Sequence, residues 1–350
     1  MNEGPCQLTL FAGLKSFTSG RAQEDLRIRP VTRVAAIDLG THNCRLIIGE
    51  RIGDVFKTIR VQSTIVLLGE GAAKTGSLQP AAIDRTIAAL KRFAEIIDDE
   101  DVSEIRAVAT EACRMAENRE AFIQTIREQT GLDFEIIPAR EEVRLAVLAS
   151  APLIEAGNIM MFDIGGGSTE VILLDTAGTA LRVLDWLSVP LGVVRGRDAM
   201  AADEVSAEEF QAQIKTDAKI FTGFFEKNAH FFKAPVHAIG SSATVTTLAA
   251  LALGLDKYHR ARVDGATFKT ENLLTLAREV AATPLDVRIA NAVIGAERAE
   301  FMIPGCAIFS AIFSLAECDN LTAADRGLRE GILNSLLPTA PKVVFSGQGG

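Results

Sequence analysis

Two stretches of the sequence place an acid just before a glycine where an apolar run ends. The two stretches are residues 34–49, VAAIDLGTHNCRLIIG, and residues 159–174, IMMFDIGGGSTEVILL. In each, a second apolar run follows the polar residues. The corresponding pairs are Asp38 and Asp163, Gly40 and Gly165, and Arg45 and Glu170. A single Asp-x-Gly is most simply a tight turn, whereas two matching copies indicate two similar units with one task.

Loops of this composition suit phosphate chemistry. Glycine has no Cβ, so backbone N–H groups can approach a ligand, and successive N–H groups form a nest for an anion. An aspartate cannot hold phosphate itself, so its natural task is to bind a divalent cation that bridges to phosphate oxygens. Asp163 and Glu170 are spaced to lie side by side on the paired strands of a hairpin. The two loops therefore predict a site that grips a phosphate chain from both sides.

A third candidate anion site is GSSAT at residues 240–244. It lies between the expected strand VHAIG and an expected helix that begins at Ser242, and a helix N-terminus attracts anions. The alternative is an ordinary N-cap. The dinucleotide fingerprint GxGxxG and the Walker sequence GxxxxGK[ST] are both absent, so those phosphate sites are not indicated.

The elements that position these loops alternate between strands and helices. Paired strands are expected on either side of the first loop, with a turn at residues 53–54 toward a third strand. Expected helices cover residues 80–98, 118–131 (with Asn118 as N-cap and Gly131 beyond the end), 140–155 and 204–228. Further strands are expected at residues 134–138 and 181–189. Two α/β halves that each open with an Asp-x-Gly hairpin predict two similar domains with the ligand site in the cleft between them.

Length, charge and cysteine content limit the class of protein. A chain of 350 residues suggests two domains, and its net charge of −9 argues against a nucleic-acid partner without excluding a local basic groove. Five scattered cysteines without a CxxC pair fit a reducing cytoplasm and give no zinc site. No apolar run is long enough to span a membrane, so no membrane partner is expected. Residues 1–30 and 341–350 are expected to be mobile tails.

Nine short motifs in order give a family resemblance from about Val34 to Leu336. The chain resembles the exopolyphosphatase/guanosine pentaphosphate phosphohydrolase (Ppx/GppA) family, within the ribonuclease H-like acetate-kinase/sugar-kinase/Hsp70/actin superfamily. The motifs are AIDLGTHNCRL (36–46), LGEG (68–71), ATEACRMAEN (109–118), REEVRL (140–145), FDIGGGSTE (162–170), PLGVVR (190–195), GSSAT (240–244), ERAEFMIPG (297–305) and RGLREGIL (326–333).

The resemblance implies two actin-like domains flanking a central cleft. Domain I would comprise residues 31–140 and 325–340, with RGLREGIL as its closing helix, and domain II residues 141–324. His42 and Ala243 depart from the usual family residues, and the sequence has no counterpart to the C-terminal HD-type extension of long members. We therefore expect the extra polyphosphate-holding surface of those members to be missing.

Roles for individual residues also follow from the resemblance. Glu142 matches the proposed catalytic carboxylate that orients or deprotonates the attacking water. Asp163 and Glu170, with Asp38 more weakly, match metal-site acids for Mg²⁺ or another divalent cation such as Mn²⁺. The expected phosphate-binding residues are Gly40, Thr41, His42, Asn43, Cys44, Arg45, Gly69, Glu70, Gly71, Arg114, Gly165, Gly166, Gly167, Ser168, Gly240, Ser241, Ser242 and Arg298; arginine forks suit phosphate oxygens.

The activity implied is removal of terminal phosphate from inorganic polyphosphate, with pppGpp or ppGpp as a further partner and a homodimer as the assembly. One alternative is an ATP-dependent small-molecule kinase of the same superfamily, which would need adenosine and acceptor pockets for which no motif is seen. Another is a non-catalytic binder of polyphosphate or (p)ppGpp, which would have no need of a water-activating acid at Glu142.

Overall fold

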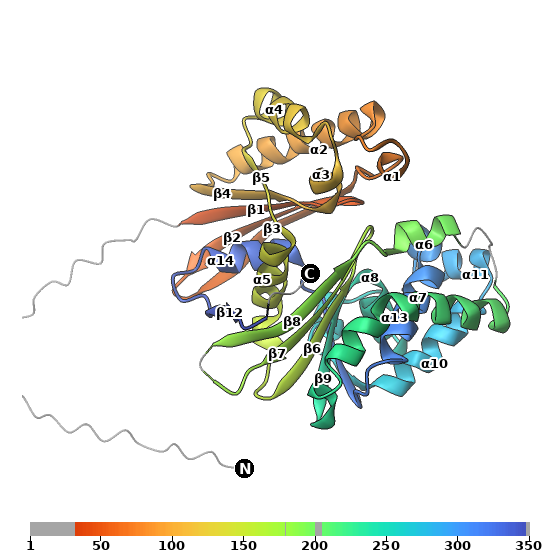
Figure 1. Cartoon of the computed structure of the whole chain (residues 1–350). Coiled ribbons are helices and arrows are strands. Elements are labelled where there is room, and N and C mark those ends of the chain that lie inside the picture. The colour runs from red at the N-terminus through yellow and green to blue at the C-terminus, as the bar shows by residue number, and fades with distance from the viewer. Residues whose placement is uncertain (1–31, 179, 200–204, 348–350) are drawn as a thin grey trace, which may run out of the picture. The chain divides into compact units, whose positions relative to one another are not determined.

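The computed structural model describes residues 32–178, 180–199 and 205–347 of the chain. These residues form an α/β structure with two β-sheets (Figure 1), which confirms the expected fold class. The N-terminal tail expected over residues 1–30 lies outside the described part. Within that part, no helix has both the length and the apolar character needed to cross a membrane.

The first sheet has five strands in the order β3-β2-β1-β4-β5. The expected turn lies at Gly53, whose φ of 62° suits glycine. Apolar residues of α2 and α4, such as Phe93 and Phe122, pack on one face of this sheet. The elements are β1 (Arg33–Leu39), β2 (Asn43–Ile52), β3 (Val55–Ile65), α1 (Ala72–Thr75), α2 (Pro80–Asp99), β4 (Glu104–Ala109), α3 (Glu111–Met115), α4 (Arg119–Thr130) and β5 (Phe134–Ile136).

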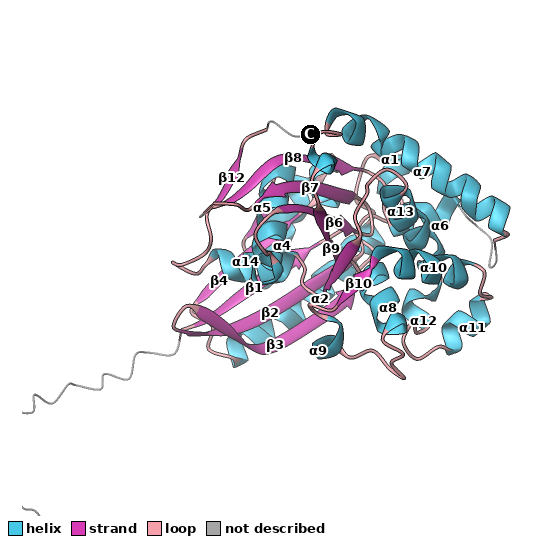
Figure 2. Cartoon of the chain, turned by 90° about the horizontal axis from the view of Figure 1, so that it is seen from below, coloured by secondary structure: helices cyan, strands magenta, loops and turns pink. Residues whose placement is uncertain are grey.

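The second sheet has seven strands in the order β10-β11-β9-β6-β7-β8-β12, and α7, α8, α10 and α13 cover one of its faces (Figure 2). Its strands are β6 (Asn158–Ile164), β7 (Thr169–Asp175), β8 (Leu181–Val189), β9 (Val236–Ser241), β10 (Thr267–Lys269), β11 (Asn320–Ala324) and β12 (Val343–Phe345). Its helices are α6 (Val193–Ala199), α7 (Ala207–Lys227), α8 (Ala243–Ala252), α9 (Arg260–Val263), α10 (Thr270–Ala281), α11 (Leu285–Ala290), α12 (Ala296–Ala299) and α13 (Met302–Phe313), with a 3-10 turn η2 (Phe231–Lys233).

Two helices, α5 (Ala139–Ser150) and α14 (Leu328–Ser335), connect the sheets. Leu145 of α5 and Ile332 of α14 pack on the first sheet, whereas Val143 and Val147 of α5 pack on the second. The helix expected over residues 140–155 ends early, because Pro152 cannot donate to the carbonyl of Leu148. That carbonyl instead accepts a hydrogen bond of 3.1 Å from the Asn334 amide of α14, and the chain continues as η1 (Ala151–Leu153).

One expectation about local structure is wrong. The C-terminal residues 343–345 are not part of a mobile tail, because they form β12 and pair in parallel with β8. Asn118 occupies the N-cap position of α4, as expected, but its side chain makes no capping hydrogen bond. Its amide is used across the fold, where Oδ1 accepts from the Leu78 N–H and Nδ2 donates to the Leu78 carbonyl. The domain boundary predicted at residues 140 and 141 falls in the first turn of α5 and stays a prediction.

Asp217 of α7 makes the stability of this fold depend on pH. The residue is 2% exposed, and burial raises the pKa of its carboxyl from 3.8 to about 6, while the Gln213 amide donates to it at 2.7 Å. Because the folded-state pKa is the higher one, the folded state loses stability as pH rises from about 4 to 6 and stays lower above that. Asp217→Asn should raise the free energy of unfolding by roughly 1 to 3 kcal/mol at pH 7.5 and hardly at all at pH 4.

Urea unfolding of both proteins at the two pH values measures this difference. Asp98→Asn, which alters an exposed carboxylate on α2, is the matched control. A gain in stability for Asp217→Asn that is the same at both pH values would show that the carboxyl charge is not its cause.

Candidate active site

Strand alternation turns the predicted charged residues toward α5. Successive side chains of a strand point to opposite faces, so Asp38 shares the face of Val34 and Ala36 that packs on α5 and α14. In the same way, Asp163 and Glu170 lie on the face of the second sheet that packs on α5. Asp163 is directly opposite Glu170 in the hairpin, as the spacing predicts, and Asp38 is opposite Arg45.

The acids of the second hairpin meet Glu142 in a cavity. The cavity is lined from α5, the second sheet and the segment that leads into α14. Its lining residues are Glu142, Ala146, Asp163, Glu170, Ser241, Arg326, Gly327 and Leu328. The structure therefore brings together the proposed catalytic carboxylate, two of the three proposed metal ligands and one serine of GSSAT.

The first turn of α5 separates two neighbouring glutamates. Glu142 lines the cavity and accepts a hydrogen bond of 2.7 Å from Arg114, which also donates to the Ile137 carbonyl. Glu141 instead pairs with Arg106 at 2.9 Å and with Arg144 at 2.7 Å. One helical step thus places Glu142 in the site and Glu141 in a separate ion-pair cluster. Arg114 reaches the site as the partner of Glu142.

Burial and mutual repulsion weaken the acidity of the site carboxyls. Burial raises the pKa of Asp38 to about 6 and that of Asp163 to about 7, although Arg45 acts in the opposite direction on both. The pKa of Glu142 is raised by burial against the effect of Arg114. Burial and the charge of Glu142 raise the pKa of Glu170 well above its usual range. Perturbed carboxyls gathered in a cavity are typical of a functional site.

Hydroxyl groups hold two of these acids. Ser188 of β8 donates to Glu170 at 2.7 Å, and Ser168 of the β6–β7 loop also hydrogen-bonds to that carboxylate. Ser241, at the end of β9, hydrogen-bonds to Asp163. Ser242 caps α8 by accepting from the Val245 N–H at 3.0 Å, so the alternative of an ordinary N-cap describes its side chain.

The two glycine loops contact each other. A Cβ on Gly166 would lie 2.9 Å from the His42 Cβ, and one on Gly167 would lie 2.9 Å from the Thr41 Oγ1. The His42 ring also meets Phe301 edge-on at 5.1 Å. The Gly69 N–H donates to the Thr41 carbonyl at 2.9 Å, which joins the predicted LGEG loop to the same place. Glycine is needed here because the two loops approach each other closely.

Of the predicted phosphate-binding residues, Ser241 is in the cavity lining, and the side chains of three others are engaged elsewhere. Cys44 is wrong as a side-chain contact, because strand alternation buries it at 0% exposure in the core under α2. Arg298 lies over the Tyr258 ring at 5.1 Å and donates to Thr247, outside the cavity lining. Glu70 is exposed and pairs with Arg85 at 2.6 Å.

The sequence reasoning missed the wall formed by Arg326, Gly327 and Leu328. These residues begin the motif RGLREGIL, for which the resemblance implies only the role of a closing helix. The pattern contained a signal, since two arginines three residues apart, Arg326 and Arg329, lie at the start of a helix that also packs on the first sheet. Arg45 lies beside this wall, with its Nη1 3.9 Å from where a Cβ on Gly327 would be.

The residues present suit a hard divalent cation that is bound in part by substrate. Within residues 32–178, 180–199 and 205–347, no group of three His, Cys, Asp or Glu side chains is arranged to hold a metal by itself. Mg²⁺ is usually held by one or two carboxylates together with phosphate oxygens and water. Asp163 and Glu170, which are paired in register and whose pKa values are raised mainly by burial, supply such a partial set.

Comparison with known proteins places the chain in a family. The sequence pattern of the Ppx/GppA phosphatase family matches residues 47–340. The chain is 29% identical to Exopolyphosphatase 2 of Mycobacterium tuberculosis over 331 residues, which cover 87% of this chain and 99% of that protein. It is 31% identical to the crystal structure of the Aquifex aeolicus Ppx/GppA family member, with a TM-score of 0.73 and coverage of 87% and 97%.

An exopolyphosphatase structure from Cytophaga hutchinsonii supports the fold alone. It has a TM-score of 0.78 at 24% identity, with coverage of 87% of this chain and 98% of that one. The family pattern spans both sheets and includes every residue that lines the cavity. The chain therefore belongs to the Ppx/GppA phosphatase family.

Proposed function

We propose that this protein is an exopolyphosphatase that releases terminal orthophosphate from inorganic polyphosphate by attack of water. The observation that carries the proposal is the cavity in which Glu142, Asp163 and Glu170 meet beside Ser241. A carboxylate that can activate water and two acids that can hold a cation are the parts that phosphoanhydride hydrolysis needs. A pure binder of polyphosphate would gain nothing from three acids that face a polyanion.

Glu142 is the residue we assign to the attacking water. Its carboxylate is held by Arg114 at 2.7 Å, which fixes its orientation at the cavity wall. Burial raises its pKa and so makes the carboxylate a better proton acceptor. In the proposed step, Glu142 accepts a proton from water as the water oxygen bonds to the terminal phosphorus. The P–O bond to the rest of the chain breaks, and the shortened polyphosphate leaves as the anion.

The phosphate chain would be bound by backbone amides of the glycine loops, by Ser241 and by Arg45. Asp163 and Glu170 would hold Mg²⁺ or Mn²⁺, with Asp38 nearby. The cation, when bound, supplies positive charge to the phosphate oxygens and to the leaving group. Arg45, which is 3.8 Å from Asp38, would supply further positive charge on the first sheet's side.

A cytoplasmic setting and a homodimer also stay proposals. The described cysteines Cys44, Cys113, Cys306 and Cys318 are all buried free thiols, which supports a reducing compartment. The homodimer and the binding of pppGpp rest on the family resemblance.

Phosphate release from long polyphosphate, short polyphosphate, pppGpp and ATP, compared side by side with Mg²⁺, tests the proposal. We expect the highest kcat/KM with polyphosphate and little release from ATP. A higher kcat/KM for pppGpp would reassign the substrate within the same chemistry. Release from none of the four compounds would show that the proposed function is wrong.

A further inference from the structure

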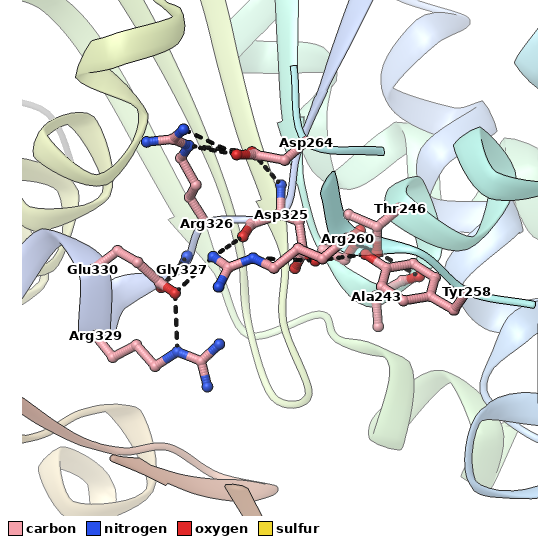
Figure 3. A network of polar contacts seen from close by, with 11 residues as sticks. Ala243, Thr246, Tyr258, Arg260, Asp264, Asp325, Arg326, Gly327, Arg329 and Glu330 are labelled. Carbon is pink, nitrogen blue, oxygen red and sulfur yellow. Dashed lines mark hydrogen bonds and ion pairs between the residues drawn. The ribbon is translucent and has the colours of Figure 1, made fainter. Parts of the chain in front are cut away.

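A network of ion pairs and hydrogen bonds holds the part of the cavity wall that Arg326 and Gly327 form (Figure 3). Asp264 accepts from Arg326 Nε at 3.0 Å and from the Asp325 N–H at 3.1 Å. Tyr258 donates to Asp325 at 2.6 Å, and Arg260 donates to the Asp325 carbonyl at 2.6 Å. Residues from the second sheet's side thus fix the segment that runs from β11 into α14. This segment includes part of the cavity wall.

Glu330 is the acceptor at the centre of this network. Its side chain is 12% exposed and accepts from the Gly327 N–H at 2.8 Å, from Arg260 at 2.9 Å and from Arg329 Nε at 3.1 Å. Arg260 and Arg329 approach it from different sides (Figure 3). Although burial would raise the pKa of Glu330, these partners, led by Arg329, lower it, so the carboxylate is charged at neutral pH.

The three arginines of the network differ in how many of their guanidinium nitrogens make hydrogen bonds or ion pairs. Arg326 forms a fork with Asp264 through Nε and Nη2, and Arg260 reaches both Asp325 and Glu330. Within the part of the chain that the structure describes, Arg329 makes its ion pair with Glu330 through Nε. A guanidinium that is anchored at Nε keeps two terminal nitrogens in a fixed plane for a second anion.

Arg329 also lies next to the cavity wall. It directly follows the wall residue Leu328, and its partner Glu330 accepts from the N–H of Gly327, another residue of that wall. Arg45 in turn lies beside Gly327. Two cations and the start of α14 therefore converge at the Asp38 end of the site. A polyanion that binds beside the three cavity acids needs such positive charge to offset their repulsion.

We propose that Arg329 is a further phosphate-binding residue, which contacts the polyphosphate chain next to Arg45, and that Glu330 is the residue that positions it. This inference rests on the proposed function for the identity of the substrate. The phosphate site would then have two arginines, Arg45 from the first hairpin and Arg329 from α14. Glu330 also accepts from Arg260 and from the Gly327 N–H, and a glutamine in its place keeps an oxygen that can accept from that N–H while it removes the charge that holds Arg329.

Equilibrium binding of long polyphosphate tests this pair directly. In a Glu142→Gln background, where turnover is slow, Arg329→Gln should raise the Kd roughly 10- to 100-fold, the usual effect of losing a charge-assisted contact. The slope of log Kd against log salt concentration should fall by about one, since one fewer counterion is released. Arg329→Lys keeps the positive charge but not the planar guanidinium. Its Kd should lie between the Kd of the Glu142→Gln parent and that of Arg329→Gln. Arg127→Gln, which alters an exposed arginine of α4, is the matched control.

Glu330→Gln should weaken binding in the same direction, and the double variant Arg329→Gln/Glu330→Gln should be no weaker than Arg329→Gln alone. A purely structural role would instead give additive losses with an unchanged salt slope, and that result would overturn the inference. So would unchanged binding in Arg329→Gln. If Arg329→Gln weakens polyphosphate binding but the wild type releases no phosphate, the proposed hydrolysis is wrong and the role of Arg329 in binding is supported.

Discussion

Replacing Glu142 by glutamine is expected to lower kcat for phosphate release by roughly 10² to 10⁴-fold, the usual contribution of a general base. Glutamine keeps the length of the side chain and can still accept from Arg114, which donates to Glu142 at 2.7 Å. It cannot accept a proton from water. Affinity for polyphosphate should hold or improve, because a buried negative charge that faces a polyanion is removed. Steady-state kinetics together with equilibrium binding separates these two effects.

The neighbouring residue gives the control for this variant. Glu141 lies outside the cavity and pairs with Arg106 and Arg144, so Glu141→Gln should leave kcat near the wild-type value even if it lowers stability. Normal turnover in Glu142→Gln with loss in Glu141→Gln would show that the assignment is off by one residue. If neither variant affects turnover, the catalytic carboxylate lies elsewhere.

The pH profile gives the same variant a second signature. Because burial raises the pKa of Glu142, the wild type should lose activity as pH falls through that raised value and the base becomes protonated. Glutamine does not titrate, so the residual activity of Glu142→Gln should lack this acid limb. An acid limb that is unchanged in the variant would assign the limb to another group.

The parts of the site that the sequence predicted are those set by short-range rules. The period of two along a strand and the hairpin spacing put Asp163 opposite Glu170, and the structure has them paired. Helical geometry separates Glu141 from Glu142 by one step, which is enough to put only one of them in the cavity. The prediction of Cys44 as a phosphate contact is wrong, because the same alternation turns its side chain into the core and leaves the other face to its neighbour Arg45.

The parts that sequence reasoning missed depend on how distant segments pack. Arg260 and Glu330 are 70 residues apart and meet only because α14 returns from the second sheet to the first. No periodicity in either segment encodes that contact. Arg298 carries the charge expected of a phosphate ligand, yet the placement of Tyr258 decides where its guanidinium lies. Residue type alone therefore identified arginines that could bind phosphate, but it could not show which of them reach the site.

Asp163→Asn is expected to abolish nearly all turnover while the protein stays folded. The change removes a charge that we assign to the cation and keeps the volume and the hydrogen bond with Ser241. Loss of Lewis-acid assistance worth several kcal/mol corresponds to a fall of roughly 10² to 10⁴-fold in rate. If weak cation binding is the cause, the Mg²⁺ concentration for half-maximal activity should rise by about tenfold or more, and excess Mg²⁺ should restore part of the activity.

The free energy of unfolding shows whether Asp163→Asn loses activity through its lost charge or through misfolding. Burial, Glu142 and Asp38 raise the pKa of Asp163 to about 7 despite Arg45, so the ionised carboxylate destabilises the metal-free fold above that pH. An asparagine side chain carries no such charge, and in EDTA at pH 8 the Asp163→Asn variant should unfold at a higher urea concentration than the wild type. Asp175→Asn, at the opposite end of the same hairpin, should retain turnover and its Mg²⁺ dependence. An Asp163→Asn protein that is fully active in EDTA would rule out the metal site, whereas an inactive but more stable one would mean that this fold keeps a costly buried acid for its chemistry.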